Sequence, residues 1–116
     1  MSAEELRELD RFCASAVMKW KKRPDKSTRG LRHGEYDIVY DGILIWTGMR
    51  FAPTTNDADA MAVLMKCVQK LPLHIEISHN GTNWFVSRPD EDEESYVLAD
   101  TLPLAICLFA KRLFEK

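Results

Sequence analysis

The chain has 116 residues, 46% of them hydrophobic and 29% charged, which are the proportions of one globular domain. Its formal charge of −2 argues against a strongly basic nucleic-acid-binding protein. The first ten residues, MSAEELRELD, are acidic and helical in pattern, unlike a signal peptide, and no apolar run reaches membrane-spanning length. We therefore expect a cytoplasmic protein that does not contact a membrane.

The charges are distributed unevenly along the chain. Residues 19–32 hold seven basic side chains and one acid, a net +6, so the remainder must carry −8 to give the total of −2. Five of the acids are consecutive, at positions 90–94. This segregation predicts one basic and one acidic segment in a protein that is nearly neutral overall.

The three cysteines, Cys13, Cys67 and Cys107, each fall within a predicted helix. They form no CxxC motif and have no zinc-type spacing to a histidine. An odd number of dispersed cysteines is typical of reduced thiols that pack as small apolar side chains in a cytosolic protein.

The chain is predicted to begin with a helix from about Ser2 to about Lys21. Ser2 and Glu5 have the spacing of a capping box. The helix carries one apolar stripe at spacings of three and four, formed by Leu6, Leu9, Phe12, Cys13, Ala16, Val17 and Trp20. Residues 23–34 have no apolar period and are predicted to form a loop.

Residues 35–47 are predicted to form a β-hairpin. Apolar and polar residues alternate before Asp41-Gly42, a dipeptide that favours a two-residue turn, and an apolar run follows it.

Residues 53–70 have the clearest helical pattern, and we expect the rest of the chain to be arranged around them. Thr54-Thr55-Asn56 offers a cap, the acids Asp57 and Asp59 favour the first turn, and Pro72 ends the helix. The stripe expected to face the core is Met61, Leu64, Met65, Val68 and Leu71.

Three short strands and a last helix complete the chain. The strands are predicted at 73–78, 84–86 and 96–99, with Asn80-Gly81 as the first turn and with Trp84 and Val86 facing the core. Thr101 is expected to cap the last helix, whose first turn tolerates a proline. Its expected core stripe is Leu102, Ile106, Phe109, Ala110 and Leu113.

The predicted order is helix, hairpin, helix, three strands and helix, which favours an α+β fold with an antiparallel sheet. We expect a single domain over residues 1–116. In it, helices pack on a three-stranded sheet to form a small sandwich, and the N-terminal helix and hairpin are additions.

Three motifs resemble those of the phage ABA sandwich domain, a family of small phage and prophage proteins. They are the helix start Phe51-Ala52-Pro53-Thr54-Thr55-Asn56, a lone Trp84 after a hairpin turn, and the helix start Thr101-Leu102-Pro103-Leu104-Ala105-Ile106-Cys107. Met61 and Asn56 stand where the family tends to carry an aromatic residue and Asp. The resemblance implies a sandwich fold, a viral origin, a place in the host cytoplasm and no catalytic residues.

The sequence lacks the motifs of common catalytic and metal sites. His33, His74 and His79 do not have the spacing of a zinc pair, and no GxSxG or phosphate-binding glycine loop occurs. The carboxylates at 90–94 have no apolar neighbours that would raise a pKa for acid catalysis. We expect no enzyme activity, no cofactor and no metal.

The basic segment suggests one binding function. Its side chains Lys19, Lys21, Lys22, Arg23, Lys26, Arg29 and Arg32 could neutralise phosphates, while Trp20 stacks on a base. Two alternatives remain. In the first, Trp20 continues the apolar stripe into the core and the lysines belong to a solvated loop. In the second, the segment pairs with residues 90–94 within one molecule or between two.

The hairpin suggests another function, because its two strands carry apolar groups on both faces. The residues concerned are Tyr40, Ile43, Ile45 and Trp46, together with Leu44. A small domain rarely covers both faces of a peripheral hairpin, so this surface is a candidate for protein binding. The alternative is that the first two helices cover it. We expect a phage accessory protein whose partner is a second copy or a host or phage protein, with nucleic acid as the alternative.

Overall fold

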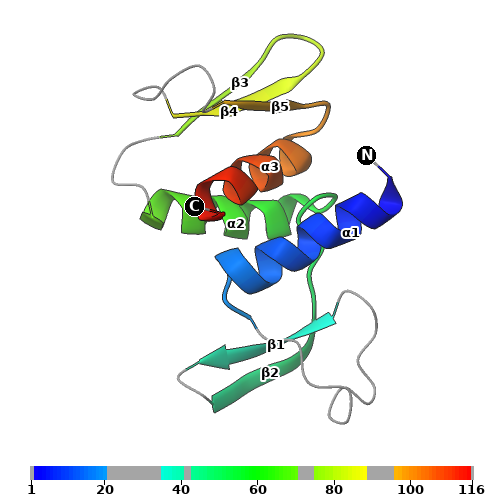
Figure 1. Ribbon diagram of the computed structural model, residues 1–116, viewed down its shortest axis with the longest axis vertical. Helices are drawn as coiled ribbons and strands as arrows, with labels where there is room; N and C mark the ends of the chain where they lie inside the picture. Colours follow the sequence, from blue (N-terminus) through cyan, green and yellow to red (C-terminus); the bar gives the residue numbers. More distant parts are fainter. Residues whose placement is uncertain (1, 21–34, 41–42, 71–74, 89–95, 116) are drawn as a thin grey trace.

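The computed structural model describes residues 2–20, 35–40, 43–70, 75–88 and 96–115. Two antiparallel sheets lie at opposite ends of the molecule with the helices between them (Figure 1). In chain order the elements are α1 (Ala3–Phe12), η1 (Cys13–Val17), β1 (Glu35–Tyr40), β2 (Ile43–Arg50), α2 (Asp57–Lys70), β3 (Glu76–His79), β4 (Trp84–Ser87), β5 (Val97–Ala99) and α3 (Leu102–Phe114).

The predicted capping box opens α1. The Glu5 amide donates to the Ser2 hydroxyl at 3.1 Å, and the Ser2 amide donates to the Glu5 carboxylate at 3.3 Å. After α1 the helix widens into the π-helix η1, where the Ser15 hydroxyl donates to the carbonyl of Arg11 at 2.8 Å. Such a hydrogen bond from a serine hydroxyl competes with the backbone hydrogen bonds of the helix. Helical structure ends before Lys19, which has a φ of +63°.

The predicted hairpin is confirmed, since β1 and β2 pair antiparallel with Tyr40 opposite Ile43. The turn residues 41–42 lie outside the described residues. Strand β2 continues to Arg50, beyond the predicted end at Thr47.

Helix α2 is confirmed, but its predicted core stripe is wrong in part. Asn56 caps it by accepting the Asp59 amide at 2.9 Å. Leu64 is buried as expected, whereas the predicted core residues Met61, Met65 and Val68 are about half exposed. The face that packs on α3 and η1 is Ala60, Val63, Leu64 and Cys67. Both faces of the helix are apolar, so periodicity could not distinguish the buried one; Leu71 and Pro72 lie outside the described residues.

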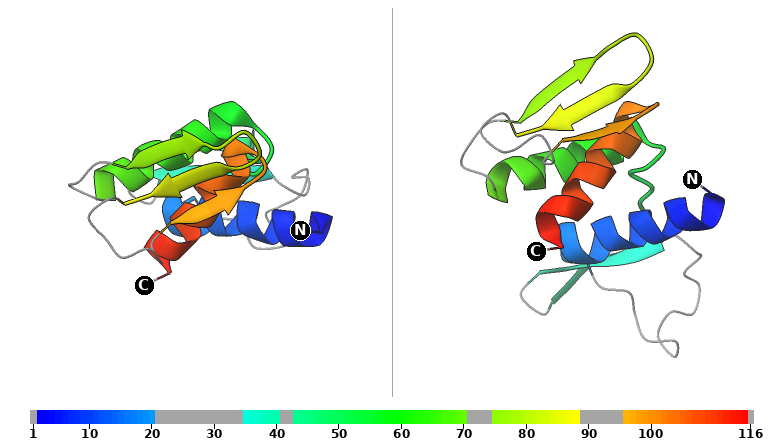
Figure 2. Two further views of the ribbon diagram at one scale, coloured as in Figure 1. Left: turned by 90° about the horizontal axis from the view of Figure 1, so that it is seen from above. Right: turned by 45° about the horizontal axis from the view of Figure 1, so that its top comes forward.

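The three predicted strands form an antiparallel sheet in the order β3-β4-β5. Asn80 makes the first turn by accepting the amides of Thr82 and Asn83, and Gly81 takes the positive φ of 96° that this turn requires. Val86 is fully buried and Trp84 packs against the core, as predicted. The sheet packs on α3 with one face, and seen from above it covers that helix (Figure 2).

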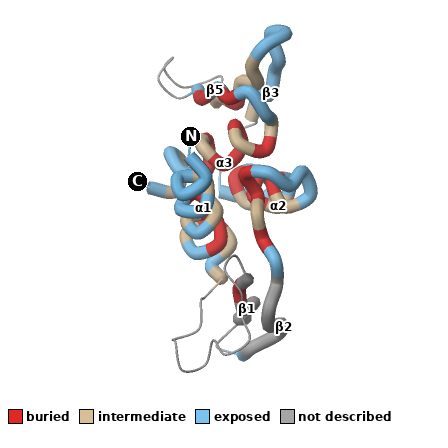
Figure 3. Tube along the Cα trace, turned by 90° about the vertical axis from the view of Figure 1, so that its right-hand side faces the viewer, coloured by how far each residue is buried: buried red, intermediate tan, exposed pale blue. Residues whose placement is uncertain are grey.

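Helix α3 lies at the centre of the molecule, a place that the sequence suggested for α2. It contacts α1, η1, α2, β4 and β5. The Thr101 hydroxyl accepts the Leu104 amide at 3.4 Å and caps α3 as predicted. Buried positions concentrate where the three α-helices meet and beneath the sheet (Figure 3).

The predicted fold class is therefore correct. The protein is an α+β sandwich of an open three-stranded antiparallel sheet and helices, to which α1 and the hairpin β1–β2 are added. Within the described ranges, no helix has the length and apolar character needed to cross a membrane.

Candidate functional site

The hairpin β1–β2 stands outside the packed body of helices (Figure 1). Its two strands contact chiefly each other, and Ile43, the first residue of β2, is 64% exposed. The side chains of Tyr40, Ile45 and Trp46, the other predicted binding residues, lie outside the described part of the structure. The backbone places Tyr40 opposite Ile43, so these two positions share one face of the hairpin.

Two irregularities in the pairing shape this hairpin. The partners change from Val39↔Leu44 to Ile38↔Trp46, which leaves Ile45 as an extra residue on β2. A second extra residue lies between Trp46 and Met49. Bulges of this kind turn side chains away from strict alternation and are common at sheet edges and next to active sites. Alternation in the sequence therefore could not assign the faces of β2.

Tyr36 and two further aromatic side chains anchor the hairpin to the body. Tyr36 is 4% exposed, and burial together with the nearby Asp10 raises the pKa of its hydroxyl. Where β2 ends, the Phe51 ring meets the Trp20 ring edge-on, with 4.7 Å between their centroids. This contact gives Trp20 the packing role that its place on the apolar stripe suggested.

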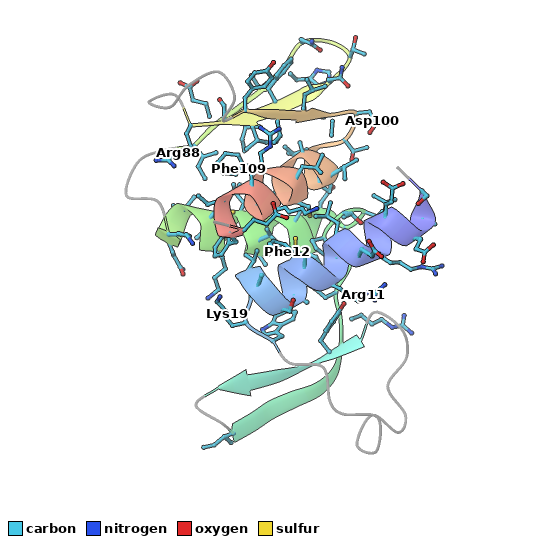
Figure 4. All side chains as sticks on the ribbon, in the orientation of Figure 1. Arg11, Phe12, Lys19, Arg88, Asp100 and Phe109 are labelled. Carbon is cyan, nitrogen blue, oxygen red and sulfur yellow. The ribbon has the colours of Figure 1, made fainter. Side chains whose placement is uncertain are left out.

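The basic segment is described only at its start. Lys19 is exposed. It follows shortly after η1, on the side of α1 that faces the hairpin (Figure 4). The other six basic residues, all within 21–32, and the acids at 90–94 lie outside the described residues. Their predicted contacts with nucleic acid or with one another stay predictions.

A polar junction that the sequence did not reveal joins α1 to the start of α2. The Asp10 carboxylate accepts the Thr54 amide at 2.9 Å, and the Asp59 carboxylate accepts the Ala52 amide at 2.9 Å. Burial, and then the charge of Asp59, raise the pKa of Asp10. These bonds orient the turn before α2. Because Asp10 and Thr54 are 44 positions apart, no local pattern pointed to them.

The structure brings the three cysteines, from η1, α2 and α3, into one buried cluster. Each is free and fully buried, and Cys13 lies near Cys107. The neighbouring thiol of Cys13, together with burial, raises the pKa of Cys107, and burial raises the pKa of Cys67 to about 12. Such thiols behave as apolar core groups, as the sequence predicted.

The described residues contain no group of three or more histidine, cysteine or acidic side chains that could hold a metal ion. His79 accepts the Gly81 amide through Nδ1 at 3.1 Å and packs against Trp84, which gives it a role in the β3–β4 turn. His33 and His74 lie outside the described residues.

Comparison with known proteins decides the family. Residues 11–110 match the family model of the phage ABA sandwich domain. The chain belongs to this phage family. A crystal structure of a phage protein from Bacillus cereus has the same fold, with a TM-score of 0.55 and 21% identity over 95% of this chain and 92% of that one. No curated protein matches the chain.

Proposed function

We propose that this phage ABA sandwich protein acts by binding another protein through the hairpin β1–β2, and that it catalyses no reaction. The observation that carries the proposal is the exposure of Ile43, at 64%, on a hairpin that is tied to the body by Tyr36 and otherwise contacts mainly itself. An exposed apolar side chain near β-bulges is a favourable anchor for a partner.

The state of the nucleophilic groups supports a non-catalytic role. All three thiols are fully buried, and the pKa values of Cys67 and Cys107 are raised, so neither presents a thiolate to a substrate. Buried free thiols also fit a protein that works in the reducing cytoplasm of the host cell.

A pull-down from host lysate tests the proposal, with the tagged protein, the variant Ile43→Ser and the matched control Ile77→Ser. Ile77 is also exposed, at 38%, but lies on β3 in the other sheet. We expect the wild type and the control to retain the same protein after nuclease treatment, and Ile43→Ser to lose it while staying folded by circular dichroism. Equal retention by Ile43→Ser contradicts the proposal, and loss of material on nuclease treatment favours nucleic-acid binding by residues 19–32.

A further inference from the structure

The hairpin β1–β2 has two outer strand edges. Among the described residues it forms a sheet of its own, in which β1 pairs only with β2. The outer edge of each strand therefore presents backbone N–H and C=O groups that no strand in this part of the chain matches. A row of such groups is a template for pairing with another extended chain, and proteins normally protect it.

The two edges differ in regularity. Both extra residues of the hairpin lie on β2, one of them Ile45 and the other between Trp46 and Met49. Bulges, lysine and proline are the usual protections of a strand edge against pairing. Strand β1 has six residues and contains no extra residue, no proline and no lysine. The outer edge of β1 is therefore the one that a further strand can join in regular register.

The pairing of β1 also determines which of its backbone groups face the outer edge. Tyr40 and Ile43 flank the two-residue turn and pair with each other, so the N–H and C=O groups of Tyr40 point to β2. The direction of these groups alternates from one residue to the next along a strand. The groups of Val39 and Asp37 consequently point away from β2, to the outer edge.

The residue types along β1 indicate the kind of strand that fits this edge. Successive positions alternate between the two faces of a strand, so the acids at positions 35 and 37 share one face. The positions on the other face are all aromatic or apolar: Tyr36, Ile38 and Tyr40. Cross-strand neighbours share a face, which favours bases opposite the two acids and apolar residues on the other side. Because Ile43 pairs with Tyr40, the exposed residue of the proposed binding site belongs to the apolar face.

We propose that the outer edge of β1 is joined by an extended segment of the partner, in which basic residues alternate with apolar ones. The inference rests on the proposed function and specifies its partner as a chain that offers a strand. Main-chain hydrogen bonds to Asp37 and Val39 supply affinity in this mode of recognition, and the alternating side chains supply specificity. A second copy of β1 does not fit, because its sequence EYDIVY contains no base to set against the acids.

Nuclear magnetic resonance with a model strand tests the edge directly. The probe is a short peptide of alternating lysine and valine, added to isotopically labelled protein, and the control peptide has glutamate in place of lysine. We expect the lysine peptide to shift the amide protons of Asp37 and Val39 downfield and to slow their exchange with solvent. The glutamate peptide should leave both amides unchanged. Amides that respond to neither peptide, or equally to both, overturn the proposal.

Two variants of β1 test the same edge against the protein captured in the pull-down. Val39→Pro removes one outward N–H and is compatible with a strand edge, while Asp37→Lys reverses one charge and keeps every backbone group. We expect each variant to lower the affinity for the partner at least about tenfold, with an unchanged circular dichroism spectrum. The control Asp100→Lys, at an exposed position at the end of the molecule opposite the hairpin, should bind like the wild type (Figure 4).

The outcomes separate this inference from the proposed function. If Ile43→Ser loses the partner while Val39→Pro and Asp37→Lys retain it, the hairpin binds by its face and only the edge pairing is overturned. If all three variants retain the partner, both proposals fail. If Val39→Pro does not fold, Asp37→Lys decides. Sedimentation velocity of the protein alone gives the remaining outcome, since a dimer that Asp37→Lys disrupts would make a second copy the occupant and contradict the assignment.

Discussion

The polar junction between α1 and α2 yields a quantitative prediction. In Asp10→Ala the amide of the buried Thr54 loses the acceptor that it contacts at 2.9 Å. Leaving such a donor without a partner costs about 1–3 kcal/mol, a sizeable part of a stability of about 5–15 kcal/mol. For a domain of this size the loss should lower the melting temperature by roughly 4–12 °C. Asp10→Asn keeps an oxygen acceptor and should stay close to the wild type at acidic pH.

The pH dependence of the same variants tests the electrostatic effect of burying Asp10. The pKa of Asp10 is raised in the folded protein, chiefly by burial, so folding favours its neutral form. The stability that the neutral Asp10 carboxyl contributes is fully present below the pKa that Asp10 has in the unfolded chain. This stability is lost as the pH rises through the pKa that Asp10 has in the folded protein. Asp10→Asn, which stays neutral, should therefore gain stability relative to the wild type as the pH rises above about 4, the ordinary pKa of an aspartate.

Chemical denaturation followed by circular dichroism across that range measures both effects. Two results would contradict this role of Asp10. Equal stability of Asp10→Ala and Asp10→Asn would show that the bond to Thr54 contributes nothing. A wild type that gains stability relative to Asp10→Asn with rising pH would show that the Asp10 carboxylate is stabilised in the fold.

Three further predictions concern the core and the turns. Thr101→Ala should destabilise the protein by about 1 kcal/mol in thermal melts, because α3 loses the side chain that caps its first turn. A variant as stable as the wild type would show that the Thr101 hydroxyl does not stabilise α3. Gly81→Ala should cost about 1–3 kcal/mol, since an L residue is strained at a φ of 96°, although nothing lies within 4 Å of the added methyl group. The thiols of Cys13, Cys67 and Cys107 should react with a thiol reagent only when guanidinium unfolds the protein, and fast labelling of the native protein would contradict their burial.

The sequence predicted best the elements whose signals are local. The capping box at Ser2 and Glu5, the Asn80-Gly81 turn and the Thr101 cap each require only neighbouring residues, and each is found as expected. The fold class followed from the predicted order of helices and strands. The family followed from motifs that include the Thr101 cap and the tryptophan after the Asn80-Gly81 turn.

Features that depend on tertiary contacts could not be predicted. Met61 and Val63 are both apolar, so only packing against α3 and η1 decides which faces the core. The bulge at Ile45 breaks the alternation on which the face assignment depended. The bond between Asp10 and Thr54 joins two elements through the folded core, and the cysteine cluster joins three.

Hydrogen–deuterium exchange of the captured complex locates the partner's binding surface on this protein. We expect the amides of the hairpin, residues 35–50, to be protected in the complex relative to the free protein, with the three-stranded sheet unchanged. Protection confined to the β3–β5 sheet or to residues 19–32, with the hairpin exchanging as in the free protein, would contradict the account.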